Sequence, residues 1–137
     1  MKIVPEQLSA RDVGRLRLET PWEVLDPTVL SRALEASLLH VSARTDEGEL
    51  VGMVRAVGDG VLYAHVQDLI VAQSYRGQGI AAALLDEILA QLDGRMANGS
   101  AIGLMAVAGL EPFYASRGFA ARPSGQYGAG MTRIRSE

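Results

Sequence analysis

The chain contains no cysteine among its 137 residues. This absence excludes a disulfide framework, a thiolate metal site and a cysteine nucleophile. It is also consistent with a reducing compartment, and we expect a cytoplasmic protein without a metal cofactor. Long low-complexity tracts are missing too, and 48% of the residues are apolar. The composition therefore predicts one globular domain over residues 1–137 rather than a disordered chain.

An excess of positive charge and long apolar segments are equally missing. The formal net charge is -3, whereas a broad nucleic-acid footprint normally requires a basic surface. No uncharged apolar window is long enough to span a bilayer, and residues 1–6 break off before a signal-peptide apolar core. We therefore expect neither a nucleic-acid partner nor a membrane partner.

The spacing of apolar and turn residues predicts an α+β architecture without repeats. Ser9 with Asp12 is typical of a capping box that starts a helix, and Asp26 before Pro27 predicts a second helix start. The expected helices begin near residues 9, 26, 80 and 111, and the expected strands cover residues 2–4, 40–44, 50–57, 61–72 and 101–107, with further candidates at 119–122 and 131–135.

The long strand over residues 61–72 changes its pattern partway. Leu62, Ala64 and Val66 share one face, but the alternation fails beyond Gln67, where three apolar residues follow in a row at 69–71. Either this end is buried on both faces or a bulge resets the register. Both interpretations predict that something packs against the far end of the strand.

Two glycines, Gly77 and Gly79, separate this strand from an apolar helix that begins at Ile80. Glycine lets the main chain approach a ligand without a side chain in the way. The start of a helix also presents unpaired N–H groups and a partial positive charge. The segment therefore predicts a site for a phosphate group.

The same glycines fit other interpretations. With Ala82 they satisfy the G-x-G-x-x-A dinucleotide pattern. A Rossmann unit, however, needs an acidic ribose partner about 20 residues later, where this chain has residues 98–100, Asn-Gly-Ser. No lysine follows the glycines, which excludes a P-loop. A glycine pair that serves helix packing and binds no ligand stays open.

A second motif lies a strand and a helix downstream, where Tyr114, Gly118 and Phe119 form Tyr-x-x-x-Gly-Phe. Together with Arg76, Gly79 and Ala81 in the pattern Arg-x-x-Gly-x-Ala, it resembles the signature of the GNAT superfamily of N-acetyltransferases. The resemblance covers about residues 50–119. The tail ending in Gly-x-Gly-Met at residues 128–131 is similar to small bacterial members. An asparagine common ahead of the tyrosine helix is absent here.

The resemblance implies a GNAT-like mixed, mostly antiparallel sheet of six to seven strands flanked by about four helices. It further implies that the strands at 61–72 and 101–107 splay apart to admit acetyl-CoA. The pantetheine arm would pair with backbone near residues 69–71, and main-chain N–H groups from residue 76 to 81 would hold the pyrophosphate. The residues assigned to the coenzyme are Leu69, Ile70, Val71, Arg76, Gly77, Gln78, Gly79, Ile80 and Ala81.

For catalysis, the resemblance makes Tyr114 the general acid that protonates the departing CoA thiolate. A core tyrosine bonded to a backbone carbonyl is the alternative. Asp68 is the candidate base because it lies on the otherwise apolar face of the long strand. An aspartate paired with an arginine is an equal alternative, and His65 is the reserve base. Trp22 lies where family members commonly cover the acceptor.

The leading interpretation is an acetyl-CoA-dependent N-acetyltransferase that transfers acetyl directly to a primary amine on a small molecule or a peptide. A non-catalytic acyl-CoA-binding module and a dinucleotide-binding oxidoreductase are the alternatives. The acceptor is not encoded in any recognisable motif. A homodimer is compatible with the resemblance.

Overall fold

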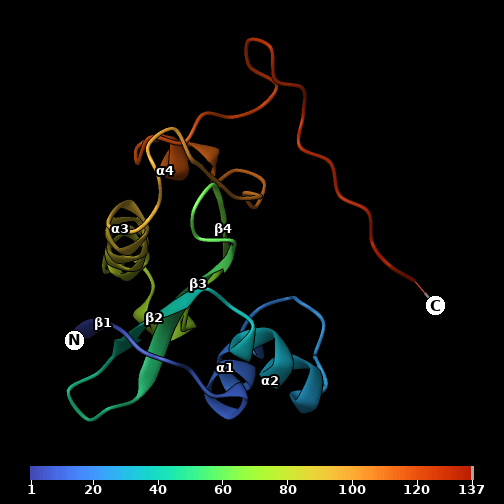
Figure 1. Ribbon diagram of the computed structural model, residues 1–137. Helices are drawn as coiled ribbons and strands as arrows, with labels where there is room; N and C mark the ends of the chain where they lie inside the picture. Colours follow the sequence, from blue (N-terminus) through green and yellow to red (C-terminus); the bar gives the residue numbers. More distant parts are fainter. Residues whose placement is uncertain (137) are drawn as a thin grey trace. The chain divides into compact units, whose positions relative to one another are not determined.

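A computed structural model describes residues 1–136 of the chain (Figure 1). The chain divides into two compact units, Met1–Gly103 and Leu104–Glu137. Among residues 1–136, no helix combines the length and the apolar composition that crossing a bilayer requires. The single domain over residues 1–137 stays a prediction.

The first unit holds five strands, three α-helices and a short 3₁₀ helix. The strands are β1 (Lys2–Pro5), β2 (Leu39–Arg44), β3 (Leu50–Gly58), β4 (Tyr63–Val71) and β5 (Ala101–Gly103). The helices are α1 (Ala10–Arg17), α2 (Pro27–Glu35), η1 (Gln73–Tyr75) and α3 (Ile80–Asp93). The second unit contains one short helix, α4 (Glu111–Ala115).

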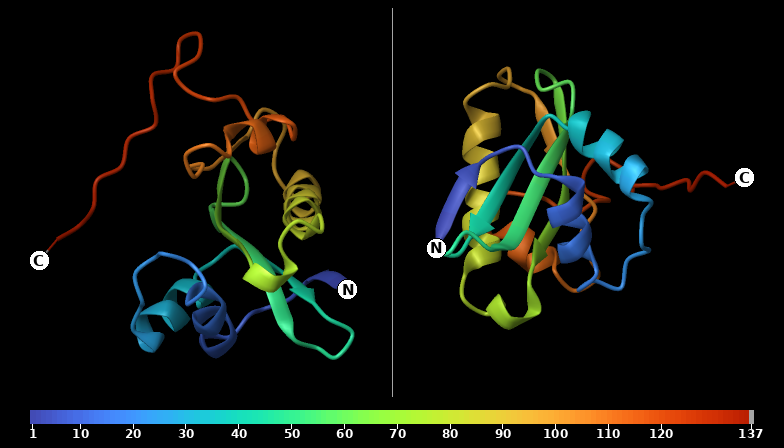
Figure 2. Two further views of the ribbon diagram at one scale, coloured as in Figure 1. Left: turned by 180° about the vertical axis from the view of Figure 1, so that it is seen from behind. Right: turned by 90° about the horizontal axis from the view of Figure 1, so that it is seen from below.

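The sheet of the first unit has the strand order β1-β2-β3-β4-β5. The first three pairings are antiparallel, and β4 pairs with β5 in parallel. The helix α3 packs against strands β1 to β4, while α1 contacts β3, β4 and α2. In Figure 2 the strands lie between α3 on one side and α1 with α2 on the other.

The helix starts form where local chemistry predicts them. The Ser9 side chain accepts a hydrogen bond from Asp12 N, and Asp26 accepts from the backbone of Thr28 and Val29. These bonds satisfy N–H groups that a helix start leaves unpaired. Pro27 occupies the first turn of α2, so both predicted caps are confirmed.

The hydrophobic core belongs to the first unit. It is built from the inner faces of the sheet and of α1, α2 and α3. Its fully buried side chains include Leu34, Met53, Leu84, Leu85, Ile88 and Leu92. Because α3 repeats its apolar residues with helical spacing, one continuous stripe of the helix is removed from water.

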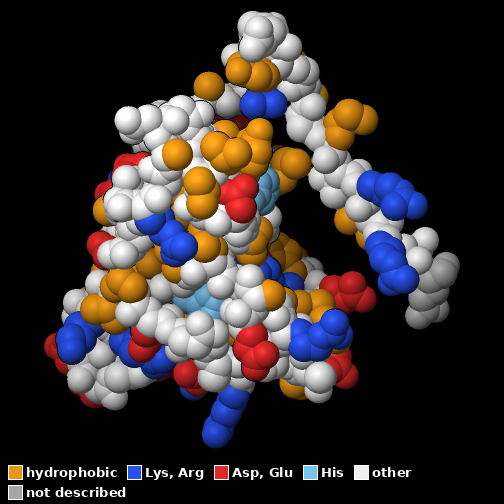
Figure 3. Space-filling view, viewed as in Figure 1, with side chains coloured by type: hydrophobic (Ala, Val, Ile, Leu, Met, Phe, Trp, Pro, Cys, Tyr) orange, Lys and Arg blue, Asp and Glu red, His pale blue; other side chains and the backbone are white. Residues whose placement is uncertain are grey.

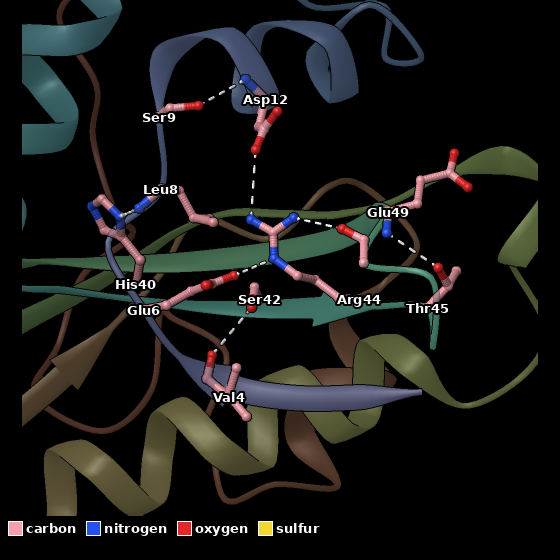
Figure 4. A network of polar contacts seen from close by, with 11 residues as sticks. Val4, Glu6, Leu8, Ser9, Asp12, His40, Ser42, Arg44, Thr45 and Glu49 are labelled. Carbon is pink, nitrogen blue, oxygen red and sulfur yellow. Dashed lines mark hydrogen bonds and ion pairs between the residues drawn. The ribbon is translucent and has the colours of Figure 1, made fainter.

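A polar network joins β1, β2 and α1 (Figure 4). Arg44 Nε donates to Glu6, and Arg44 Nη2 lies 3.5 Å from Asp12 Oδ2. The buried ring of His40 accepts from Leu8 N at 2.9 Å through Nδ1. The network fastens the segment between β1 and α1 to the sheet.

The number of strands differs from the prediction of six to seven. Among residues 1–136 the sheet has five, because the segments 119–122 and 131–135 form no strand. In addition, β5 ends at Gly103 instead of residue 107. Only an isolated bridge joins Ser124 and Tyr127. The mixed, mostly antiparallel α+β class is confirmed together with the four α-helices.

Candidate active site

The glycine turn before α3 has the backbone conformation that glycine favours. Gly77 has φ 78° and Gly79, the N-cap of α3, has φ 81°. A Cβ atom placed on either residue would meet nothing within 4 Å. The positive φ values therefore require these glycines, and close helix packing does not. This excludes the interpretation of a glycine pair that serves packing alone.

The turn presents a row of free backbone donors. Among residues 1–136, no acceptor pairs with the N–H groups of residues 77–82. Those at the start of α3 also carry the positive end of the helix dipole. Consecutive N–H groups around a glycine turn form a concave site for an anion such as a phosphate.

Arg76 does not extend freely from this turn. Its Nε donates to the carbonyl of Val71 at 3.0 Å, and its Nη2 donates to the carbonyl of Glu19 at 3.5 Å. The Glu19 carboxylate in turn accepts from Gln73 N at 2.8 Å. Arg76 thus ties the end of β4 to the segment after α1, and its positive charge lies beside the free donors.

A β-bulge interrupts β4 at the point where the sequence pattern fails. Arg55 is paired with Gln67, whereas Met53 is paired with Ile70, so two residues of β4 lie opposite one residue of β3. Asp68 is one of these two, and its φ of 55° is the only positive value of a non-glycine residue in the described part of the chain. The bulge predicted for the long strand is therefore present. Burial on both faces is found as well, because the consecutive residues Ile70 and Val71 are both buried.

Beyond the bulge, one edge of β4 has no strand partner within the first unit. The pairing of β4 with β5 ends at His65 and Gly103. Ala72 N donates to Val51 of β3, and backbone groups alternate along a strand, so those of Val71 point away from β3. Apart from the Val71 carbonyl, which accepts from Arg76, the outward backbone groups between residues 69 and 71 are accordingly placed to pair with an extended ligand.

Two arginines hold the Asp68 carboxylate. Arg55 Nε lies 2.7 Å from Oδ2, and Arg17 Nη1 lies 3.3 Å from Oδ1. The Arg17 guanidinium also stacks on the Trp22 ring at 5.1 Å. The predicted base therefore has both oxygens occupied by positively charged partners. His65, the reserve base, is half-buried and lies on β4 beside Gly103.

Tyr114 lies on α4 in the second unit. Its half-buried ring makes edge contacts with Phe113 at 5.1 Å and Phe119 at 6.1 Å between ring centres. Burial raises the pKa of the Tyr114 hydroxyl. Among the described residues of its unit, this hydroxyl has no hydrogen-bond partner. The hydroxyl therefore carries its proton at neutral pH.

Comparison with known proteins assigns the chain to a family. The profile described as "Acetyltransferase (GNAT) domain" matches residues 5–135. The chain belongs to the GNAT family of acetyltransferases. This agrees with the resemblance that the motifs at Arg76–Ala81 and Tyr114–Phe119 predicted.

Relatives of this GNAT chain come from plants and bacteria. Serotonin N-acetyltransferase 2, chloroplastic, from Oryza sativa subsp. japonica is 37% identical over 79% of this chain and 54% of its own length. Histone acetyltransferase TAP1 from Glycine max is 34% identical over 63% of this chain and 36% of its own. The chain thus spans about half the length, or less, of these curated relatives.

The solved structure of a GNAT family acetyltransferase from Streptococcus pneumoniae TIGR4 matches along the whole chain. It is 29% identical, with a TM-score of 0.80 that covers 99% of this chain and 98% of that one. The N-acetyltransferase fold is therefore shared over both units of this GNAT chain.

The glycine turn forms where the sequence predicts it, and the bulge is one of the two interpretations that the long strand allowed. The sequence also left open that an arginine pairs with Asp68, but it singled out neither Arg17 nor Arg55. Arg55 lies across the β3–β4 hairpin from Gln67, so counting back from the turn at residues 58–60 would have placed it near Asp68. Arg17 lies on a helix 51 residues away from Asp68. No local signal links those two residues.

Proposed function

We propose that this GNAT chain is an acetyl-CoA-dependent N-acetyltransferase that transfers acetyl directly to a primary amine. The observation that carries the proposal is the row of free N–H groups over residues 77–82, which follows the open edge of β4 after the short helix η1. A CoA molecule combines a diphosphate with an extended amide chain, and it needs these two kinds of site next to each other.

In this proposal the diphosphate binds to the N–H groups between Gly77 and Ala81. The pantetheine amides pair with those backbone groups of residues 69–71 that point away from β3, where the edge of β4 lacks a strand partner. The thioester then lies near the bulge. Backbone N–H groups after the bulge stabilise the oxyanion of the tetrahedral intermediate.

The amine nitrogen attacks the thioester carbonyl, so a C–N bond forms and the C–S bond breaks. Because the chain has no cysteine, an acyl-cysteine intermediate is excluded and direct attack is favoured. Tyr114 is assigned as the general acid that donates its hydroxyl proton to the leaving thiolate. Burial raises the pKa of this hydroxyl, so it carries its proton at neutral pH.

The incoming ammonium must lose a proton before attack. Asp68 was the base expected from the sequence, but protonating it would remove the charge that binds Arg17 and Arg55. We therefore assign this proton to bulk water or to His65, which lies on the same strand.

The names of the relatives indicate the chemical class of the acceptor. Relatives named for serotonin and for histones support a primary amine on a small molecule or on a protein. Part of the surface, shown in Figure 3, carries acidic and basic side chains interspersed. We propose a cytoplasmic enzyme without a nucleic-acid or membrane partner.

The test is release of free thiol from acetyl-CoA with a panel of amines that includes serotonin, polyamines, amino sugars and lysine peptides. Release that depends on one amine supports the proposal. Tight CoA binding without release for any amine would instead indicate a non-catalytic acyl-CoA-binding module.

The glycine turn can be tested separately with Gly79→Leu. We expect loss of CoA binding by calorimetry, because a leucine side chain would occupy the space in front of the N–H groups. Gly99→Leu is the matched control, since Gly99 has a similar φ of 79° and equally open surroundings outside the turn. Normal CoA binding by Gly79→Leu would contradict the site.

A further inference from the structure

Asp68 combines an unusual backbone with an unusual set of partners. Its φ of 55° lies in the left-handed region, which non-glycine residues rarely adopt. Such a conformation persists only where the surrounding structure holds it. The holding groups come from the neighbouring strand β3 and from α1, which is distant in the sequence.

The three charged side chains form a nearly buried cluster. The exposed fractions are 10% for Asp68, 14% for Arg17 and 16% for Arg55. Arg55 is itself fixed, because its Nη1 donates to Ser37 Oγ at 3.0 Å. Arg17 is fixed by the Trp22 ring. The carboxylate is therefore gripped from two sides by groups that are themselves held.

The position of this cluster relates it to the proposed reaction. At the bulge, Asp68 interrupts the regular ladder immediately before Leu69, so its conformation sets the direction of the next backbone N–H groups. An oxyanion donor works only if it is already aimed at the developing charge. If the bulge changed its conformation, the N–H groups that follow it would no longer point at the developing negative charge.

We propose that Asp68 is a positioning residue, clamped by Arg17 and Arg55, that fixes the β4 bulge so that the backbone of residues 69–71 faces the thioester. It exchanges no proton with the amine. The orientation toward the thioester rests on the proposed function. The claim that Arg17 and Arg55 hold Asp68 and thereby the bulge does not.

Three substitutions at one site separate this role from that of a base. Asp68→Asn keeps an acceptor oxygen for an arginine and suits a positive φ, Asp68→Gly keeps only the φ, and Asp68→Ala keeps neither. If Asp68 has a positioning role, kcat is highest in the wild type and falls in the order Asp68→Asn, Asp68→Gly and Asp68→Ala. We expect about 100-fold loss or more for Ala, the scale of a misplaced oxyanion donor. Asp68→Asn is expected to be at least about tenfold more active than Asp68→Ala.

The pH profile of kcat/KM provides an independent readout. If Asp68 is a base, its acidic limb disappears in Asp68→Asn. If Asp68 is a positioning residue, the limb persists in Asp68→Asn at a lower rate. Equal losses in all three variants, a gap between Asn and Ala below about tenfold, or a vanished limb would overturn the proposal.

Readouts without turnover distinguish failure of this inference from failure of the proposed function. Trp22 is the single tryptophan, so its fluorescence reports release of Arg17. We expect Asp68→Ala to shift this emission and to accelerate amide hydrogen exchange over residues 66–71. Glu6→Gln, which breaks the separate ion pair with Arg44, is the control and is expected to change neither. Unchanged exchange in Asp68→Ala would overturn the clamp even if the wild type acetylates no amine.

Should the Asp68 variants not fold, Arg17 supplies a second test. Arg17→Lys keeps a cation for Asp68, and Arg17→Met keeps only the aliphatic length. We expect Arg17→Lys to retain at least about tenfold more kcat than Arg17→Met, with KM for acetyl-CoA little changed in both. Equal activity of the two variants would overturn the proposal.

Discussion

Tyr114 shows what a single residue contributes to the proposed chemistry. Its hydroxyl is the group whose loss should affect the chemical step alone, since its ring remains packed by Phe113 and Phe119. We predict that Tyr114→Phe lowers kcat by about 100-fold, within the range for general acid catalysis. Acetyl-CoA affinity, measured by calorimetry, is expected to stay near wild type. Unchanged turnover would remove Tyr114 from the mechanism.

His40 gives a prediction on stability at the same scale. Burial lowers the pKa of His40, and its hydrogen bond to the Leu34 carbonyl opposes this shift. Nδ1 accepts from Leu8 N, so the neutral ring with a proton on Nε2 fits the site. The pKa of His40 in the folded state lies below the ordinary 6.5. The protonated ring therefore destabilises the folded state, and this happens only at acidic pH.

The full contribution of His40 to stability is therefore present above about pH 6.5 and is lost as the pH falls below it. We predict that the unfolding free energy of the wild type declines there by up to about 1.4 kcal/mol per pH unit. Denaturant titrations between pH 5.5 and 8 measure this slope. His40→Gln is expected to be less stable at pH 8 but to show a flatter dependence. The same slope in both proteins would exclude His40 as its source.

At the scale of elements, the helix starts follow from short stretches of sequence. Asp26 caps α2 through bonds to Thr28 N at 2.8 Å and Val29 N at 3.4 Å. We predict that Asp26→Ala lowers the unfolding free energy by about 1 kcal/mol, as for other N-caps. Glu35→Ala, at the opposite end of α2, is the control and is expected to cost nothing. Equal losses would mean that the cap is not the cause.

The strands show the opposite behaviour, because strand formation depends on a partner. The segments 101–107 and 131–135 have strand-like composition, yet the first forms only the three residues of β5 and the second none. The antiparallel hairpins β2–β3 and β3–β4 were predictable, since a turn and an alternating pattern lie next to each other in the chain. The partner of a terminal segment has no such local signal.

At the scale of the molecule, the buried apolar core lies entirely between Leu8 and Leu92 among the described residues. All five strands and α1 to α3 also belong to residues 1–103. We predict that a fragment 1–103 unfolds cooperatively in a thermal scan but releases no thiol from acetyl-CoA, because it lacks Tyr114. A fragment without a thermal transition would contradict this division of the fold.

Ligand specificity is also a property of the whole chain. A ligand that binds only the folded state raises its melting temperature. We predict that acetyl-CoA and CoA at about 100 times Kd stabilise the protein by about 2.7 kcal/mol, whereas NADH and NADPH have no effect. A shift with NADH alone would favour the dinucleotide interpretation of Gly77 and Gly79.

The sequence by itself determined the features that depend on neighbouring residues. These are the caps at Ser9 and Asp26, the glycine turn at Gly77 and Gly79 before α3, and the family signature that includes Tyr114. Only the tertiary structure decided what surrounds Asp68, because Arg17 approaches it from a helix 51 residues earlier. The sequence alone does not distinguish an aspartate that is free to accept a proton from one that is held by arginines. That difference depends on which side chains the fold brings next to it.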